Sequence, residues 1–250
     1  MKDLLATCNR GVLERLAAAP TLLAFDFDGT LAPIVATRTD ARMRARTARL
    51  FAEVCRRYPC AVISGRAVAD VRPRLAGAPV AYVVGNHGAD DGVARAAAAR
   101  VVARVRDAIA ATVATLAGVD LEDKGASLAI HYRHAPRPAV AAAAIFAALS
   151  TAPRSIRIVG GKRVINVMAR TAPHKGRALR TLVARARVTT ALYVGDDDTD
   201  EDVFRGAPAG RLITVRVGAR RSSAAAYYVR TQPALDDMLA RLLRLRATAP

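Results

Sequence analysis

The stretch "TLLAFDFDGT" at residues 21–30 places an apolar run directly before two aspartates, a glycine and a threonine. The run is apolar on both faces, as expected for a parallel strand covered by helices on each side. Strand periodicity would point Asp26 and Asp28 to the same side of the chain, and Gly29 allows a sharp turn. Both carboxylates would then lie at the carboxyl edge of a parallel sheet, where open α/β folds bind ligands. An ordinary turn with capping aspartates is the alternative interpretation, because Asp-Gly is a common turn pair.

Similar apolar runs recur along the chain and alternate with helical patterns. The other predicted strands are 60–64, 81–85, 191–195 and 212–218. The predicted helices between and around them are 40–58, 67–76, 175–187 and 233–246. This alternation is typical of a doubly wound α/β fold built on a parallel sheet.

The middle of the chain has a different pattern. It predicts a helix at 94–117, a strand at 127–133, a helix at 136–149, and two extended runs within 155–169 that meet at Gly160 and Gly161 as a hairpin. We expect a small α+β domain at 92–170, inserted into a core made of 1–91 and 171–250. Turn-forming residues cluster at both boundaries, near 89–92 and 170–173.

Composition excludes several classes of protein. The 250 residues are 52% hydrophobic, which suits a globular protein with a substantial core. We expect a cytoplasmic protein without a membrane partner, because no run of about 18 apolar residues occurs and residues 1–20 read as an amphipathic helix. Cys8, Cys55 and Cys60 are odd in number and have no metal-binding spacing, so neither disulfides nor a zinc site is predicted.

The formal net charge of +18 comes almost entirely from arginine and raises the possibility of a nucleic-acid partner. The arginines are scattered along Ala-rich helical segments, without a basic tail or an aromatic-interleaved patch. We therefore expect no nucleic-acid partner, but a monomer that acts on a small molecule.

A second acidic stretch, "GDDDTDED" at 195–202, packs six carboxylates into eight residues. These charges repel one another, and a divalent cation with oxygen ligands would relieve the repulsion. Mg²⁺ also bridges carboxylates and phosphate oxygens. Asp196 and Asp200 can reach one point if a turn begins between them. A calcium-binding EF-hand loop is excluded, because the stretch lacks the mid-loop glycine and follows a strand instead of a helix.

Two further residues lie at the ends of predicted elements. Ser64, in "ISGR" at 63–66, places a hydroxyl at the carboxyl edge of the second strand, although helix capping would equally account for it. Lys175 opens a predicted helix, where the helix dipole disfavours a cation. That placement is sensible if an anion lies between the lysine and the helix.

Together, the order DxDGT, Ser, Lys and GDDxTD resembles the haloacid dehalogenase-like (HAD) phosphohydrolases. The resemblance implies an HAD-like core, in which an aspartyl-phosphate forms on a nucleophile and a second aspartate acts as acid and then as base. It also implies Mg²⁺, stabilising the phosphoryl charge together with a lysine and hydrogen-bond donors. The implied roles are nucleophile for Asp26, acid and base for Asp28, phosphoryl binding for Ser64 and Lys175, Mg²⁺ binding for Asp26, the Asp28 carbonyl and Asp196, and metal support for Asp197 and Asp200.

Several segments are more specific and resemble the trehalose-6-phosphate phosphatase family: "DFDGTLAPI", "GNHGAD" (85–90), "LEDKGASLAIHYR" (121–133) and "GGKRVINV" (160–167). The resemblance implies hydrolysis of trehalose 6-phosphate, the last step of trehalose biosynthesis. It implies that the inserted domain is a cap that binds the sugar. The implied substrate-binding residues are Asn86, His87, Glu122, Lys124, Arg133, Lys162 and Asn166.

Asn166 departs from the family pattern, which usually carries glutamate at this position. Asparagine offers one accepting oxygen and a donor amide where glutamate offers two acceptors. The departure leaves open a related phosphatase for another phosphorylated sugar, such as mannosyl-3-phosphoglycerate. An inactive protein with this fold is disfavoured by the presence of both Asp26 and Asp28.

Overall fold

The computed structural model describes residues 1–89, 92–152, 155–208 and 210–248. The chain forms two compact units, one made of Met1–Gly85 with Lys175–Pro250 and the other of Asn86–His174. The first predicted domain boundary, between residues 91 and 92, falls at Asp91, which lies outside the described residues. The predicted boundaries of the functional domains therefore stay a prediction.

The larger unit is built on a seven-stranded sheet in which every described pair of neighbours is parallel. All five predicted strands are present, which confirms the predicted α/β class. Two short strands at one edge were not predicted, because runs of two and three residues carry no periodicity. In sheet order the strands are β1 (Lys2–Asp3), β11 (Tyr227–Val229), β10 (Leu212–Val217), β9 (Thr190–Gly195), β2 (Thr21–Phe25), β3 (Cys60–Ile63) and β4 (Tyr82–Val84).

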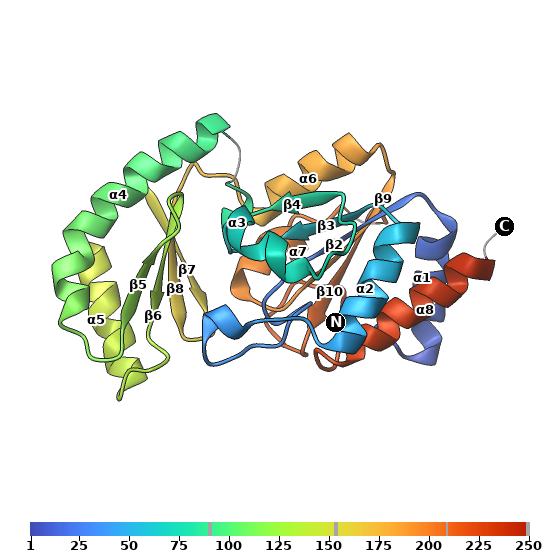
Figure 1. Cartoon of the computed structure of the whole chain (residues 1–250), viewed down its shortest axis with the longest axis horizontal. Helices are drawn as coiled ribbons and strands as arrows, with labels where there is room; N and C mark the ends of the chain where they lie inside the picture. The colour runs from blue at the N-terminus through green and yellow to red at the C-terminus, as the bar shows by residue number, and fades with distance from the viewer. Residues whose placement is uncertain (90–91, 153–154, 209, 249–250) are drawn as a thin grey trace. The chain divides into compact units, whose positions relative to one another are not determined.

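Helices cover both faces of this sheet, so the unit has three layers (Figure 1). Strand β2 shows why its sequence is apolar throughout. Leu23 and Phe25 belong to one core cluster, with the first set of helices, whereas Leu22 and Ala24 belong to the other. The first set is α1 (Arg10–Ala18), α2 (Ala45–Arg57) and α8 (Ala234–Thr248), and the second is α6 (Lys175–Ala186) and α7 (Glu201–Phe204).

Three predicted helices are clearly shorter than expected, and one of them, predicted at 40–58, is α2. The amphipathic pattern over 1–20 gives a helix only at α1, because the chain before it forms β1 and a 3₁₀ turn at Thr7–Asn9. The pattern over 67–76 gives α3 (Val68–Val71) followed by a 3₁₀ turn at Arg72–Leu75. Pro73 removes one backbone donor there, and proline also clashes with a preceding helical turn.

The smaller unit has the predicted α+β composition. Its helices are α4 (Gly92–Ala114) and α5 (Pro138–Ser150), and its four-stranded sheet is antiparallel. In sheet order the strands are β5 (Asp120–Asp123), β6 (Ser127–His131), β8 (Val164–Ala169) and β7 (Ile156–Gly161). Strand β5 was not predicted, because "DLED" is short and mostly acidic.

The hairpin of the smaller unit turns later than predicted. Gly160 and Gly161 are the last residues of β7, and Gly161 pairs with Val164. The turn is made by Lys162 and Arg163, and Arg163 adopts a left-handed φ of 62°. The pattern of two glycines therefore marked the end of the strand, two residues before the turn closes. No helix in the described part of the chain is long and apolar enough to cross a membrane.

Candidate active site

The first acidic motif lies at the carboxyl end of β2, as predicted. Strand pairing continues one residue beyond β2, because the Asp26 amide donates to the Val194 carbonyl at 2.9 Å. The chain then turns at Gly29, whose φ is +82°. A Cβ atom at Gly29 would lie 2.1 Å from Oδ2 of Asp196, so a side chain there would displace Asp196. The glycine thus lets the two acidic motifs approach each other.

A buried lysine joins the two motifs. Lys175, the first residue of α6, places Nζ 2.9 Å from Oδ1 of Asp26 and 2.7 Å from Oδ1 of Asp200. Asp26, Asp196 and Asp200 each offer a carboxylate oxygen within 4.8 Å of the others, and all three are buried. An anion was expected near Lys175 because it begins a helix. In this structure two carboxylates, those of Asp26 and Asp200, take that place.

Asp200 organises the acidic loop after β9. Its Oδ1 also accepts a hydrogen bond from the Tyr193 hydroxyl at 2.7 Å. Its Oδ2 accepts the backbone amides of Asp196 at 2.8 Å and Asp197 at 2.9 Å. Gly195 permits this turn, because a Cβ there would lie 2.3 Å from Cγ of Asp200. Both oxygens of Asp200 are thus engaged by donors of the protein.

A buried ion pair supports the same loop from β10. Arg216 pairs with Gly195 in the sheet, and its guanidinium donates to the carbonyl oxygens of Asp196 and Asp197. It also lies 3.3 Å from Oε1 of Glu201, and both of these side chains are buried. Sequence reasoning did not find Arg216, because its contact depends on β10 lying beside β9.

Burial and neighbouring charges shift the pKa values of the cluster. Burial raises the pKa of Asp26 well above its usual value, Lys175 opposes this, and the carboxylates of Asp200 and Asp196 add to it. Burial alone would lower the pKa of Lys175, but Asp200 and Asp26 outweigh it and raise that pKa. Burial raises the pKa of Tyr193, and the charge of Asp200 raises it further. Lys175 therefore stays an ammonium. A cation near Asp26 would favour the ionised form of the Asp26 carboxyl.

Asp28 has different partners from Asp26. Both of its oxygens accept hydrogen bonds from Arg66, at 2.7 Å from Nε and 2.7 Å from Nη2. Strand β2 ends at Phe25, and the turn at Gly29 follows directly, so strand periodicity does not describe the pair. The two aspartates therefore have different cationic partners, Lys175 for Asp26 and Arg66 for Asp28. That both side chains point to the same side of the chain stays a prediction.

Ser64 lies at the carboxyl end of β3 and is fully buried. Its hydroxyl oxygen accepts the backbone amide of Arg66 at 3.1 Å. The N-cap of the following helix α3 is Ala67, so Ser64 is not a helix cap. The alternative explanation for this serine is thereby removed, and its hydroxyl remains at the edge where the acidic motifs lie.

In the smaller unit, three predicted side chains and one unpredicted histidine gather on one face of the sheet. Leu128, Ile130, Ile165 and Val167 pack with α4 and α5 residues in the core of this unit. Strand alternation therefore places Ala129, His131 and Asn166 on the opposite face. Glu122 pairs with Ala129, which pairs with Asn166, so these three lie in line across neighbouring strands.

Glu122 is the centre of this group. Its Oε2 lies 2.9 Å from Nε2 of His131 and 3.8 Å from Nζ of Lys124. Glu122 and Lys124 were predicted from the sequence, whereas His131 was not. The spacing could have indicated His131, since it is two residues beyond Ala129 on β6 and both side chains point to the same face of the sheet.

The other predicted binding residues occupy turns. Asn86 and His87 form a buried 3₁₀ turn with left-handed φ values of 49° and 56°. Lys162 lies in the exposed turn between β7 and β8. The Tyr132 amide donates to the Arg163 carbonyl at 3.1 Å, so Arg133 lies beside the same end of the sheet.

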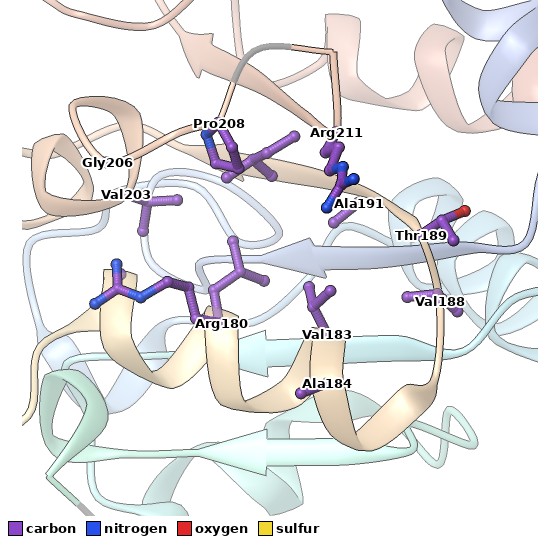
Figure 2. Close-up of a pocket in the computed structure, with 13 residues that line it drawn as sticks. Arg180, Val183, Ala184, Val188, Thr189, Ala191, Val203, Gly206, Pro208 and Arg211 are labelled. Carbon is purple, nitrogen blue, oxygen red and sulfur yellow. The ribbon is translucent and has the colours of Figure 1, made fainter.

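A cavity of about 380 Å³ in the larger unit lies elsewhere (Figure 2). Figure 2 shows the apolar side chains of Val183 and Val203, with Arg180 and Arg211 beside them. Among the described residues, the lining does not include the aspartates of the two acidic motifs. This cavity is therefore separate from the candidate active site.

Comparisons with known proteins agree with one another. The family model described as Trehalose-phosphatase matches residues 24–230. The chain is 36% identical over 226 residues to a trehalose-phosphate phosphatase of Mycobacterium avium, across 82% of this chain and 57% of that protein. It is 32% identical over 261 residues to one of Mycobacterium tuberculosis, across 95% of this chain and 66% of that protein. The chain thus spans about three fifths of the length of these curated relatives.

Solved structures show the same fold. The C-terminal domain of a Candida albicans trehalose-6-phosphate phosphatase matches with a TM-score of 0.82 and 21% identity, across 94% of this chain and 97% of that one. An Aspergillus fumigatus trehalose-6-phosphate phosphatase matches with a TM-score of 0.64 and 25% identity, over the whole of both chains. The HAD-like core with an inserted α+β unit, predicted from the motifs, is confirmed.

Proposed function

The chain belongs to the trehalose-phosphatase family, and from that premise we propose that it is a phosphatase that hydrolyses trehalose 6-phosphate to trehalose and phosphate. The observation that carries the proposal is the buried cluster of Asp26, Lys175, Asp196 and Asp200 at the carboxyl ends of β2 and β9. A nucleophilic carboxylate, a fixed cation and further acidic ligands are what phosphoryl transfer through an aspartyl-phosphate requires.

In the proposed first step, Asp26 attacks the phosphorus atom with one carboxylate oxygen. The bond between phosphorus and the sugar oxygen breaks, and that oxygen takes a proton from Asp28. In the second step, a water molecule gives a proton to Asp28 and attacks the same phosphorus atom, which releases phosphate and restores Asp26. The proposed role of Lys175 and the Ser64 hydroxyl is to bind the phosphoryl oxygens as negative charge builds up on them.

The residues present fit a magnesium ion. Buried carboxylates repel one another unless they are paired, and three oxygens from Asp26, Asp196 and Asp200 converge within 4.8 Å. We propose that Asp26, the Asp28 carbonyl and Asp196 bind Mg²⁺, which supplies electrostatic stabilisation of the phosphoryl oxygens when bound. Because Asp200 already accepts four hydrogen bonds or ion-pair contacts, its proposed role is to hold Lys175 and the loop, with Asp197 supporting it.

We propose that the unit inserted between β4 and α6 is the cap that selects the sugar, with 92–170 as its predicted extent. Glu122, Lys124 and Asn166 offer acceptors and donors on one sheet face, which suits a polyhydroxylated sugar. Arg133 and Lys162, at one end of this sheet, and the turn of Asn86 and His87 complete the proposed sugar-binding set.

The test is phosphate release from trehalose 6-phosphate, with and without Mg²⁺, beside glucose 6-phosphate, mannosyl-3-phosphoglycerate and 4-nitrophenyl phosphate. We expect release that requires Mg²⁺, is abolished by EDTA, and favours trehalose 6-phosphate. The Asp26→Asn variant, isosteric but a poor nucleophile, controls for contaminating phosphatases and should release none. Absence of Mg²⁺-dependent release from every substrate would refute the proposed function.

A second candidate is a phosphatase for another phosphorylated sugar, such as mannosyl-3-phosphoglycerate. Asn166 favours it, since this residue stands in line with Glu122 on the cap sheet and departs from the glutamate of the family pattern. Preference for mannosyl-3-phosphoglycerate over trehalose 6-phosphate in the same assay would select this candidate and leave the proposed chemistry of Asp26 unchanged.

A further inference from the structure

The side chain of Arg66 is held by several hydrogen bonds at the edge of the larger sheet. Its Nε and Nη2 atoms each lie 2.7 Å from a different oxygen of Asp28, which is a bidentate pair. The Arg66 side chain is 2% exposed, whereas that of Asp28 is 36% exposed. The buried partner is therefore the arginine, and the aspartate reaches from it toward solvent.

The guanidinium is fixed on its other sides as well. Its Nη1 lies 2.8 Å from Oδ2 of Asp70, its Nη2 donates to the Arg38 carbonyl at 2.9 Å, and its Cζ lies 5.7 Å from the ring centroid of Phe27. Its own backbone amide donates to Ser64. Because these contacts fix the orientation of the guanidinium, the arginine sets the orientation of the Asp28 carboxylate.

We propose that Arg66 is a positioning residue for Asp28, fixing the plane and direction of its carboxylate beside the candidate nucleophile. The inference rests on the proposed function, which assigns proton transfer to Asp28. It explains why an arginine is needed: Asp28 lies in a turn beyond the end of β2, where its backbone makes only an isolated bridge with Ala32. Two parallel hydrogen bonds from a planar fork define a carboxylate plane, whereas a lysine ammonium makes a single point contact.

Proton transfer depends strongly on this orientation, because donor and acceptor must approach within about 3 Å. A misplacement of about 1 Å can lower the rate by about 100-fold. We therefore expect Arg66→Lys to lower kcat for the sugar phosphate by roughly 10- to 100-fold, with KM changed by less than about 3-fold. The charge beside Asp28 is kept in this variant, and only the fork is lost.

A double-mutant cycle separates positioning from a general structural role. Arg66→Lys, Asp28→Ala and the double variant are compared by steady-state turnover of 4-nitrophenyl phosphate, whose good leaving group keeps the slow variants measurable. If Arg66 acts through Asp28, adding Arg66→Lys to Asp28→Ala changes the rate by less than about 2-fold. An equal loss in both backgrounds, or an Arg66→Lys variant that is fully active toward the sugar phosphate, would overturn the inference.

Arg74→Lys is the matched control. Arg74 also pairs with Asp70 but makes no described contact with Asp28, so this variant should retain activity within about 2-fold. Should Arg66→Lys fail to fold in a circular-dichroism melt, Asp70→Asn replaces it in the cycle, since it loosens the far end of the Arg66 guanidinium. Its smaller loss must likewise disappear beside Asp28→Ala, and its persistence would overturn the inference. A wild-type protein that turns over none of the test substrates would refute the proposed function and, with it, the role of Arg66.

Discussion

At the scale of single residues, Tyr193 supports the acidic loop after β9 through a hydrogen bond to Asp200. Its hydroxyl is one of the donors to the fully buried Asp200, and Tyr193 itself is fully buried on β9. We expect Tyr193→Phe to lower the free energy of unfolding by about 1–3 kcal/mol, because a hydrogen bond to a buried carboxylate is lost while the ring packing stays. Urea unfolding followed by circular dichroism measures this change.

Tyr132→Phe is the control for that substitution. Tyr132 is half-buried, and its hydroxyl makes no hydrogen bond among the described residues. We expect its variant to unfold within about 0.5 kcal/mol of the wild type. Equal stability of the Tyr193 and Tyr132 variants would show that Asp200 does not depend on the tyrosine.

At the scale of secondary-structure elements, the buried strands were the best predicted. Strand β2 is apolar at every position because both of its faces are covered, and that pattern is visible in the sequence. Strands β1 and β5 were missed because they are short and mostly charged, and β11 was missed because three residues carry no periodicity. The pattern over 67–76 failed for a different reason, because Pro73 interrupts the helix that the apolar spacing suggests.

The link between β10 and the acidic loop gives a prediction at this scale. Arg216→Met would leave Glu201 buried without its cation and would remove donors from two loop carbonyls. We expect a loss of roughly 3–5 kcal/mol in the free energy of unfolding, measured by urea denaturation, because an unpaired buried charge is costly.

Two further variants show whether the loss in the free energy of unfolding comes from the unpaired buried charge. Adding Glu201→Gln to Arg216→Met should recover part of the loss, since the glutamine is neutral. Arg230→Met, which removes an exposed ion pair with Asp3, should cost less than about 1 kcal/mol. Similar losses for Arg216→Met and Arg230→Met would mean that the buried pair does not stabilise the loop.

At the scale of the whole molecule, the sequence indicates the residues of the candidate site better than the residues that hold them in place. Asp26, Ser64 and Asp196 follow apolar strands, and parallel strands bring their carboxyl ends to one edge. Arg66 and Arg216 could not be assigned this way, because their contacts depend on which strands are neighbours in the sheet and on how loops turn. Sheet order is a property of the assembled core, and no local pattern encodes it.

From the assembled core we expect the stability of the protein to depend jointly on pH and Mg²⁺. Burial raises the pKa of Asp26 above its value in the unfolded chain, and Asp200 and Asp196 add to the shift. The stability contributed by its protonated form is therefore fully present below the unfolded pKa and is lost as pH rises through the folded pKa. Without metal, Asp26 should make the protein less stable as pH rises through this window.

Magnesium binding at Asp26, as proposed above, would reverse this cost, because a cation favours the ionised carboxylate. We expect the increase in Tm caused by Mg²⁺, relative to EDTA, to grow as pH rises, because Asp26 becomes available as an ionised ligand. Differential scanning fluorimetry at fixed ionic strength measures it. In Asp26→Asn the increase should be smaller and should depend less on pH. An increase in the wild type that matches that of Asp26→Asn at every pH would show that Asp26 does not bind the metal as an ionised ligand, since removing its carboxylate would then have no effect on binding.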